Sequence, residues 1–452
     1  MSGSLLRPAL ISLAGLALLA PATVPAQARP DADRVTERVP VAEGRGGAVA
    51  SVDPEATAAG LAVLRRGGNA VDAAVATAAA LGVTEPYSAG VGGGGYLVYY
   101  DARSGRVHTI DGRETAPAAM PRDAFLDPAT GQPYPFSPQL VTSGVSVGVP
   151  GTPATWERAL AKWGRLSLAE TLAPAITIAR RGFVVDATFR QQTLDNRVRF
   201  EAFPASSALF LPGGDAPAVG SVFRNPDLAD TYRLLGKRGA NAIYRGEIAR
   251  EIVSAVQDPV TSPTTTLPVP AGFLTTSDLA SYRALDQKPT KVGYRGLDVY
   301  SMAPSSSGGT TVGEALNILE NYRLGRLGTA AALHYYPDAS ALAFADRNAY
   351  VGDPAFIDVP TRTLLSQRFA DSRACLIPEG TRLVTPTAPG DLEADGCSTA
   401  VAVGQDVPGQ STTHLVTADR WGNVVSYTLT IEQAGGSGMV VPGRGFLLNN
   451  EL

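Results

Sequence analysis

The sequence is poor in the residues that most often bind metal ions. It contains three histidines and two cysteines among 452 residues, and none of the histidines lies close in sequence to both cysteines. Zinc and similar metals need such ligands gathered at short spacings. We therefore expect no metal site.

Long hydrophobic runs and long runs of like charge are also absent. The apolar run at residues 9–20 is shorter than the ~20 residues that span a bilayer, and no later uncharged stretch is long enough. A net charge of -4, without a basic patch, excludes a dedicated nucleic-acid binder. The 44% of hydrophobic and 18% of charged residues are ordinary for a globular protein.

The first residues have the layout of a secretory signal peptide. Arg7 precedes the apolar run, and a small-residue site, Ala-Gln-Ala, follows at residues 26–28. We expect residues 1–28 to be removed and the mature protein to be secreted or periplasmic, without a membrane contact. A retained membrane anchor is the alternative, and the prolines around the cleavage site argue against it.

The two cysteines, Cys375 and Cys397, are predicted to form one disulfide, because an exported chain folds in an oxidising compartment. The bond would close the segment that precedes the candidate cleavage site described below. Two buried thiols are the alternative interpretation.

Hydrophobic periodicity predicts a mixed α/β chain. Helical patterns cover residues 53–82 and most of residues 152–257, whereas β patterns cover residues 96–110, 291–301 and 412–431. Strands at both ends with helices between them indicate a single mixed unit, not a string of independent domains.

The β-hairpin at residues 412–431 is the most informative local pattern. If its turn is a three-residue loop with glycine in the left-handed conformation, Thr412 falls opposite Thr430 and His414 falls opposite Thr428. All four side chains would then share one face, with Thr428 diagonal to Thr412. A bulge would shift this register by one residue.

Thr412 is the candidate nucleophile. A hydroxyl needs a base, but no nucleophile elbow accompanies His108, His334 or His414. We interpret the first two as structural and place His414 beside the site without a proton-transfer role. The other solution is a threonine that becomes the first residue of a chain, so that its own α-amine is the base. This requires cleavage after Ser411. Adjacent threonines in strands are otherwise simply good β-formers.

Several segments, taken together and in order, resemble the gamma-glutamyltransferases, N-terminal-nucleophile hydrolases that are made as one precursor. The matching segments are residues 67–74 (Gly-Gly-Asn-Ala-Val-Asp-Ala-Ala), 92–95 (four glycines), 111–117 (Asp-Gly-Arg-Glu-Thr-Ala-Pro), 149–151 (Val-Pro-Gly), 304–309 (Pro-Ser-Ser-Ser-Gly-Gly), 412–414 (Thr-Thr-His) and 447–451 (Leu-Leu-Asn-Asn-Glu). The resemblance implies an αββα sandwich of two stacked sheets flanked by helices.

The resemblance also implies self-cleavage between Ser411 and Thr412. Residues 29–411 would form the large subunit, and residues 412–452 would begin the small subunit. Family members continue past the equivalent of Leu452 with substrate-binding residues and with the glycine pair of the oxyanion hole, so we expect the sequence to be truncated.

Individual roles follow from the same resemblance. Thr412 is the nucleophile, and Thr428 is expected to hydrogen-bond it. Thr430 stands where many members have an asparagine that contacts the substrate. A β-sheet role is the alternative for Thr428.

The resemblance also implies which residues bind the charged groups of the substrate. Arg113 would bind the substrate α-carboxylate, a task suited to a planar guanidinium, with a surface ion pair as the alternative. Glu451 would receive the α-amino group. Asn450 beside it is a further candidate contact, with a turn-forming role as the alternative.

The implied reaction is a two-step acyl transfer without a metal or organic cofactor. Thr412 attacks the γ-glutamyl amide of glutathione or a related compound, and water, an amino acid or a peptide accepts the glutamyl group. The expected partners are these small molecules and the two subunits of the same precursor, with no nucleic acid. The alternatives are an acylase for poly-γ-glutamate or glutaryl amides, and a non-catalytic γ-glutamyl-binding relative.

Overall fold

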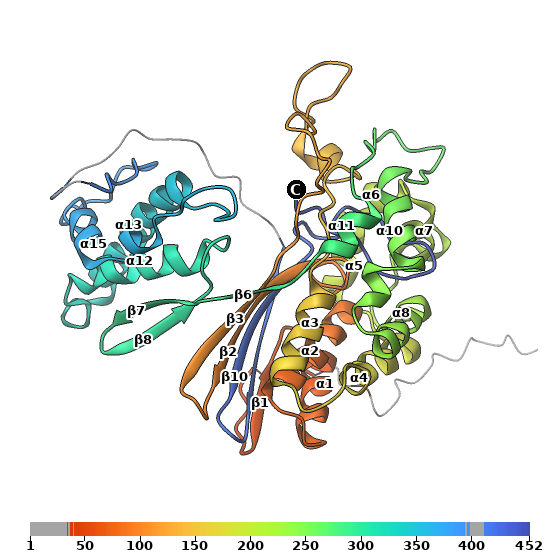
Figure 1. The fold of residues 1–452 in the computed structure, drawn as a ribbon, viewed down its shortest axis with the longest axis horizontal. Helices are drawn as coiled ribbons and strands as arrows, with labels where there is room; N and C mark the ends of the chain where they lie inside the picture. The colour runs from red at the N-terminus through yellow and green to blue at the C-terminus, as the bar shows by residue number, and fades with distance from the viewer. Residues whose placement is uncertain (1–33, 35–36, 39, 394–395, 398–410) are drawn as a thin grey trace, which may run out of the picture. The chain divides into compact units, whose positions relative to one another are not determined.

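A six-stranded antiparallel sheet forms the centre of the fold in the computed structural model, which describes residues 34, 37–38, 40–393, 396–397 and 411–452 (Figure 1). The strand order is β1-β9-β10-β2-β3-β6. The strands are β1 (Gly47–Ala50), β2 (Gly94–Asp101), β3 (Arg106–Gly112), β6 (Leu285–Gln287), β9 (Thr413–Asp419) and β10 (Val424–Thr430). The chain divides after Arg34, and all elements described here lie in the unit Val35–Leu452.

Helices α1 (Pro54–Arg65), α2 (Ala70–Thr84) and α3 (Thr152–Trp163) lie along one face of this sheet (Figure 1). Every residue of α2 is buried, because it is sandwiched between β9 and β10 on one side and α4 (Leu168–Arg181) on the other. Its alanines permit this close packing on all sides.

The starts of α1 and α2 follow from their capping residues. Asp53 is the N-cap of α1, because its side chain accepts a hydrogen bond from Ala56 N–H at 2.7 Å. Asn69 and Asp72 form a capping box at the start of α2. Asp419, at the end of β9, accepts a hydrogen bond from Ala70 N–H at 3.0 Å and so ties α2 to the sheet.

The remaining elements form a helical region and a smaller α/β region. The first contains β4 (Phe183–Val184), β5 (Val222–Phe223), α5 (Ala187–Asp195), α6 (Arg197–Glu201), α7 (Pro204–Phe210), α8 (Pro226–Arg238), α9 (Asn241–Tyr244), α10 (Glu247–Gln257) and α11 (Thr276–Ser281). The second contains β7 (Thr290–Tyr294), β8 (Leu297–Ser301), α12 (Gly308–Glu320), α13 (Thr329–Tyr350), α14 (Thr361–Leu364) and α15 (Gln367–Ala374). Short single turns of helix lie at Phe136–Leu140, Pro212–Gly214 and Leu324–Arg326.

The expected β pattern at residues 291–301 forms a hairpin. The backbone turns at Arg295 and Gly296, which both have positive φ, so that β7 pairs with β8. Helix α12 begins at Gly308, and the Ser307 carbonyl accepts a hydrogen bond from Thr311 N–H at 2.9 Å.

The expected fold class, an α/β fold of the αββα sandwich type, is confirmed at the level of antiparallel sheets flanked by helices. Within the described ranges, one six-stranded sheet is present and the other two sheets have two strands each. The face of the large sheet opposite the helices carries half-buried or exposed side chains, among them Tyr96, Val98, His414 and Val416. No helix in the described part of the chain is long and apolar enough to cross a membrane.

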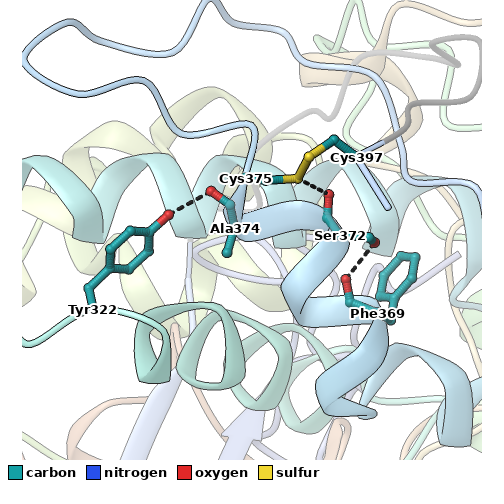
Figure 2. Close-up of a disulfide and its surroundings, with 6 residues drawn as sticks. All are labelled: Tyr322, Phe369, Ser372, Ala374, Cys375 and Cys397. Carbon is teal, nitrogen blue, oxygen red and sulfur yellow. Dashed lines mark hydrogen bonds between the residues drawn. A yellow bond between two sulfur atoms is a disulfide. The ribbon is translucent and has the colours of Figure 1, made fainter. Parts of the chain in front are cut away.

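Cys375 and Cys397 form a disulfide at the end of α15, with their Cα atoms 5.9 Å apart (Figure 2). Tyr322, at the end of α12, donates a hydrogen bond to the carbonyl of Ala374 at 2.5 Å. The disulfide therefore adjoins the packed end of this helix pair.

Candidate active site

Ser411 and Thr412 directly precede β9 and lie against the end of β10. Thr412 Oγ1 is 2.8 Å from the carbonyl oxygen of Ser411 and 3.4 Å from Thr430 Oγ1. Thr430 Oγ1 in turn donates a hydrogen bond to the Ser411 carbonyl at 2.9 Å. Two hydroxyls thus converge on the carbonyl of the bond expected to be cleaved.

The pairing of β9 with β10 brings these hydroxyls together. His414 pairs with Thr428, as expected, and Thr413 pairs with Leu429, so Thr430 extends beside Thr412 at the end of the ladder. The expected left-handed glycine in the turn is also confirmed, because Gly422 has φ +85°.

Thr428 is hydrogen-bonded to His414. Its Oγ1 lies 2.8 Å from His414 Nδ1, and the other ring nitrogen of His414 lies 3.2 Å from Ser426 Oγ. Partial burial lowers the pKa of His414 below its usual value of 6.5 and so favours the neutral ring. The expected contact between Thr428 and Thr412 stays a prediction.

Ser411 also contacts a segment that is distant in the sequence. Its hydroxyl lies 2.9 Å from Ser88 Oγ, in the segment between α2 and β2. This contact joins residues 323 positions apart in the sequence and was not part of the expected site. Sequence periodicity carries no signal for it, because neither serine lies in a helix or strand.

Arg113 follows β3, and its backbone is fixed from two sides. Its N–H donates to Asp111 Oδ1 at 2.9 Å, and its carbonyl accepts from Tyr282 OH at 2.6 Å. The guanidinium forms an ion pair with Glu451 and lies 5.7 Å from the ring centre of Tyr96. The structure therefore brings together Arg113 and Glu451, two of the predicted substrate-binding residues.

Glu114 is a buried carboxyl at this site, and the sequence predicted no role for it. Its side chain has 0% exposure, and neither carboxylate oxygen has a hydrogen-bond partner within the described residues. Burial raises the pKa of Glu114 from 4.5 to about 7, and the Arg113 guanidinium, 3.8 Å away, opposes that rise. The available signal was an acidic residue next to Arg113 at the end of a buried strand.

Asn450 and its neighbour Asn449 hold the last described segment in place. Asn450 Oδ1 accepts a hydrogen bond from Gln433 N–H at 3.0 Å, and Asn450 N–H donates to the Ile431 carbonyl at 3.2 Å. The Asn449 side chain donates to the carbonyls of Gly92 and Gly148. These contacts position Glu451 next to Arg113. The side-chain oxygen of Asn450 already accepts a hydrogen bond from the backbone.

The hydroxyls of Thr412 and Thr430 and the ion pair formed by Arg113 lie at the same end of neighbouring strands. Thr430 on β10 is paired with Gly94 on β2, and Gly95 is paired with Gly112 on β3, next to Arg113. The approach of β2 to β10 requires glycine at Gly93, because a Cβ there would overlap the Thr430 carbonyl oxygen.

Within the described ranges, no group of three or more histidine, cysteine, aspartate or glutamate side chains is arranged to hold a metal ion. The side chains gathered at the site include the hydroxyls of Thr412 and Thr430, the guanidinium of Arg113 and the carboxylate of Glu451. Such a set is suited to acyl transfer, in which a hydroxyl attacks a carbonyl and charged side chains orient the substrate.

Comparison with known proteins finds relatives that match most of the chain. A family model described as gamma-glutamyltranspeptidase matches residues 56–452. The chain is 38% identical to the glutathione hydrolase proenzyme of Bacillus subtilis (strain 168) over 444 residues, which cover 96% of this chain and 73% of that protein. It is 36% identical to the acylase ACY 1 proenzyme of Pseudomonas sp. (strain SE83), with 93% and 71% of the two chains covered.

Two solved structures are also similar. The cephalosporin acylase from Bacillus halodurans has a TM-score of 0.78 and 33% identity, covering 93% of this chain and 72% of that chain. The Helicobacter pylori gamma-glutamyltranspeptidase has a TM-score of 0.69 and 33% identity, covering 76% and 95%.

Proposed function

The chain belongs to the gamma-glutamyltranspeptidase family, and from this premise we propose that it cleaves γ-glutamyl amides such as glutathione and passes the glutamyl group to water or to an amine. It is an enzyme made as a proenzyme. The observation that carries the proposal is the convergence of the Thr412 and Thr430 hydroxyls on the Ser411 carbonyl.

Self-cleavage would begin with attack of Thr412 Oγ1 on the carbonyl carbon of Ser411. The peptide C–N bond breaks, an ester forms between the two residues, and the hydroxyl proton ends on the released nitrogen. Water then hydrolyses the ester. The products are a large subunit ending at Ser411 and a second chain whose first residue, Thr412, carries a free α-amine beside its own hydroxyl.

Turnover would use the same hydroxyl. The α-amine of Thr412 accepts its proton as Oγ1 attacks the γ-carbonyl of the substrate, and the amine part of the substrate leaves with a proton. Water or an acceptor amine then releases the glutamyl group from the ester. Arg113 would bind the substrate α-carboxylate and Glu451 its α-ammonium, so that both charged groups of the glutamyl unit are recognised.

Acylase activity on a glutaryl or similar side chain is the second candidate, because an acylase proenzyme and a cephalosporin acylase are among the similar proteins. A glutaryl group has the carboxylate but not the α-ammonium of glutamate. If the wild-type protein prefers glutathione over a glutaryl amide and Glu451→Gln loses this preference, the glutamyl assignment is supported. Equal rates of the wild-type protein on both substrates support the acylase.

We further propose that the protein is exported after removal of residues 1–28. Those residues lie outside the described part of the chain. The disulfide between Cys375 and Cys397 supports the proposal, because such bonds persist in oxidising compartments. Mass spectrometry of the protein recovered outside the cytoplasm tests it, with a first residue near Arg29 expected.

Intact-mass analysis and N-terminal sequencing test the self-cleavage step. The wild-type protein is expected to yield a chain beginning Thr-Thr-His at residue 412, and Thr412→Ala is expected to remain uncut and inactive. Thr412→Ser retains a hydroxyl nucleophile and serves as the matched control, with slow cleavage expected. Cleavage of Thr412→Ala at the same bond overturns the proposal.

A further inference from the structure

We propose that Thr430 is a catalytic residue of the self-cleavage step, in which its hydroxyl stabilises the negative charge that develops on the Ser411 carbonyl oxygen. The inference rests on the proposed self-processing function and adds a residue-specific role to it. The family resemblance implies only a substrate contact for Thr430.

The hydrogen bonds around Thr430 fix the direction of its single hydroxyl proton. The backbone N–H of Glu432 donates to Thr430 Oγ1 at 2.7 Å. That bond occupies a lone pair of the oxygen, so the proton is free to point at the Ser411 carbonyl, 2.9 Å away. The hydroxyl therefore acts as a donor where the scissile bond needs one.

The surroundings of Thr430 hold it in this orientation. Its exposed fraction is 3%, and the side chain is β-branched, so few rotamers are open to it. Glu432 has φ +73°, an uncommon value for a residue other than glycine, and this conformation accompanies the return of its N–H toward Thr430. The donor is preorganised by the chain before cleavage occurs.

The charge that Thr430 would stabilise arises from the attack by Thr412. As the bond from Thr412 Oγ1 to the carbonyl carbon forms, the electron pair of the C=O bond moves onto the Ser411 oxygen. A hydrogen bond to an oxyanion is shorter and stronger than one to a neutral carbonyl, so it lowers the barrier. Collapse of this intermediate returns the electron pair and expels the Thr412 nitrogen, which takes up the hydroxyl proton.

Thr430 differs in this respect from the other hydroxyls on β10. Thr428 and Ser426 both contact the ring of His414, and neither has a hydrogen bond to Ser411 within the described residues. Among the described hydroxyls of β10, only that of Thr430, at the end of the strand, donates to this carbonyl.

The experiment follows the rate of cleavage at residue 412 by intact mass in Thr430→Val, Thr430→Ser, Thr430→Asn and Ser426→Ala. Valine keeps the shape of threonine without the hydroxyl and is expected to slow cleavage by roughly 10²–10³-fold, the usual effect of removing one oxyanion donor. Serine and asparagine both restore a donor and are expected to cleave within about tenfold of wild type, a difference of about 1.4 kcal/mol in barrier. Ser426→Ala is the control and should cleave at the wild-type rate.

Thermal unfolding of both Thr430 variants in the uncut Thr412→Ala background separates this role from a loss of structure. The proposal requires that Thr412→Ala/Thr430→Val keep a cooperative transition close to that of Thr412→Ala/Thr430→Ser, while Thr430→Val alone slows cleavage. Cleavage of Thr430→Val at the wild-type rate, with Thr412→Ala uncut, overturns the inference and leaves the proposed function intact. Cleavage of Thr412→Ala overturns the proposed function itself.

Discussion

Arg113 and Glu451 form an ion pair with each other. Both side chains are mostly buried, with 21% and 16% exposure, so a charge left unpaired here is costly. A glutamyl substrate has a carboxylate and an ammonium on one carbon and so offers each side chain a new partner. Binding would replace the ion pair between Arg113 and Glu451 with two ion pairs to the substrate. A substrate with only one of these groups would leave the charge of one side chain unpaired.

Arg113→Lys is expected to lower kcat/KM for glutathione by about 10- to 100-fold, the usual value of a charged hydrogen bond, because lysine keeps the charge without the bidentate geometry. Steady-state kinetics measure this. Arg106→Lys, at the exposed start of the same strand, is the control and should leave kcat/KM unchanged. An unaltered kcat/KM in Arg113→Lys removes Arg113 from the substrate site.

Because of Glu114, the free energy of unfolding should decrease as the pH rises. Its folded pKa of about 7 lies above the ordinary value of 4.5, so the folded protein holds this proton more tightly than the unfolded chain does. The associated stability is fully present below pH 4.5 and is lost as the pH rises to about 7, an amount on the order of 3 kcal/mol.

Urea unfolding of uncleaved Thr412→Ala chains at pH 4.5 and pH 8 measures this effect. Adding Glu114→Gln removes the ionisable group, so the difference in unfolding free energy between the two pH values should change by that amount. Glu379→Gln, at an exposed position, is the matched control. The same pH dependence with and without Glu114 shows that this carboxyl is not held protonated.

Gly93→Ala is expected to destabilise the protein by about 1–3 kcal/mol and to slow self-cleavage, because the added Cβ pushes against the Thr430 carbonyl. Chemical unfolding and intact mass measure the two effects. Gly90→Ala is the control, since no atom of the described residues lies within 4 Å of its Cβ position, and its change in unfolding free energy should stay within about 0.5 kcal/mol. Equal behaviour of the two variants contradicts the close approach of β2 and β10.

Loss of the disulfide should destabilise the region that contains α12 and α15. The loop spans 22 residues, for which the chain-entropy estimate is about 3 kcal/mol. Cys375→Ser/Cys397→Ser is expected to lower the thermal midpoint, and reductant should lower that of the wild type similarly. An identical midpoint in oxidised wild type and double variant means that the bond contributes no stability.

The local parts of the fold were predictable from the sequence. The alternation of residues in β9 and β10 and the glycine at position 422 define the hairpin, so the pairing of His414 with Thr428 followed from turn geometry alone. The Asp53 cap was predictable for the same reason, because its partner, Ala56, is three positions away. In both cases the interacting residues are close in sequence.

The missed features depend on contacts between distant segments. Ser88 meets Ser411, and the buried Arg199 donates to the carbonyls of Ala434 and Gly436, which shapes the loop after Thr430. No periodicity relates such pairs. The burial of Glu114 has the same origin, because it depends on how β3 packs within the folded chain.

The strand order also determines what holds the two products of cleavage together. Strands β9 and β10 follow Thr412 and lie between β1 and β2, which precede it, with backbone hydrogen bonds on both sides. Cleavage of the chain before β9 breaks a covalent bond but none of the backbone hydrogen bonds between these strands. The mature protein would therefore be two polypeptides interlocked in one sheet, which dissociate only by unfolding, and maturation would be irreversible once they separate.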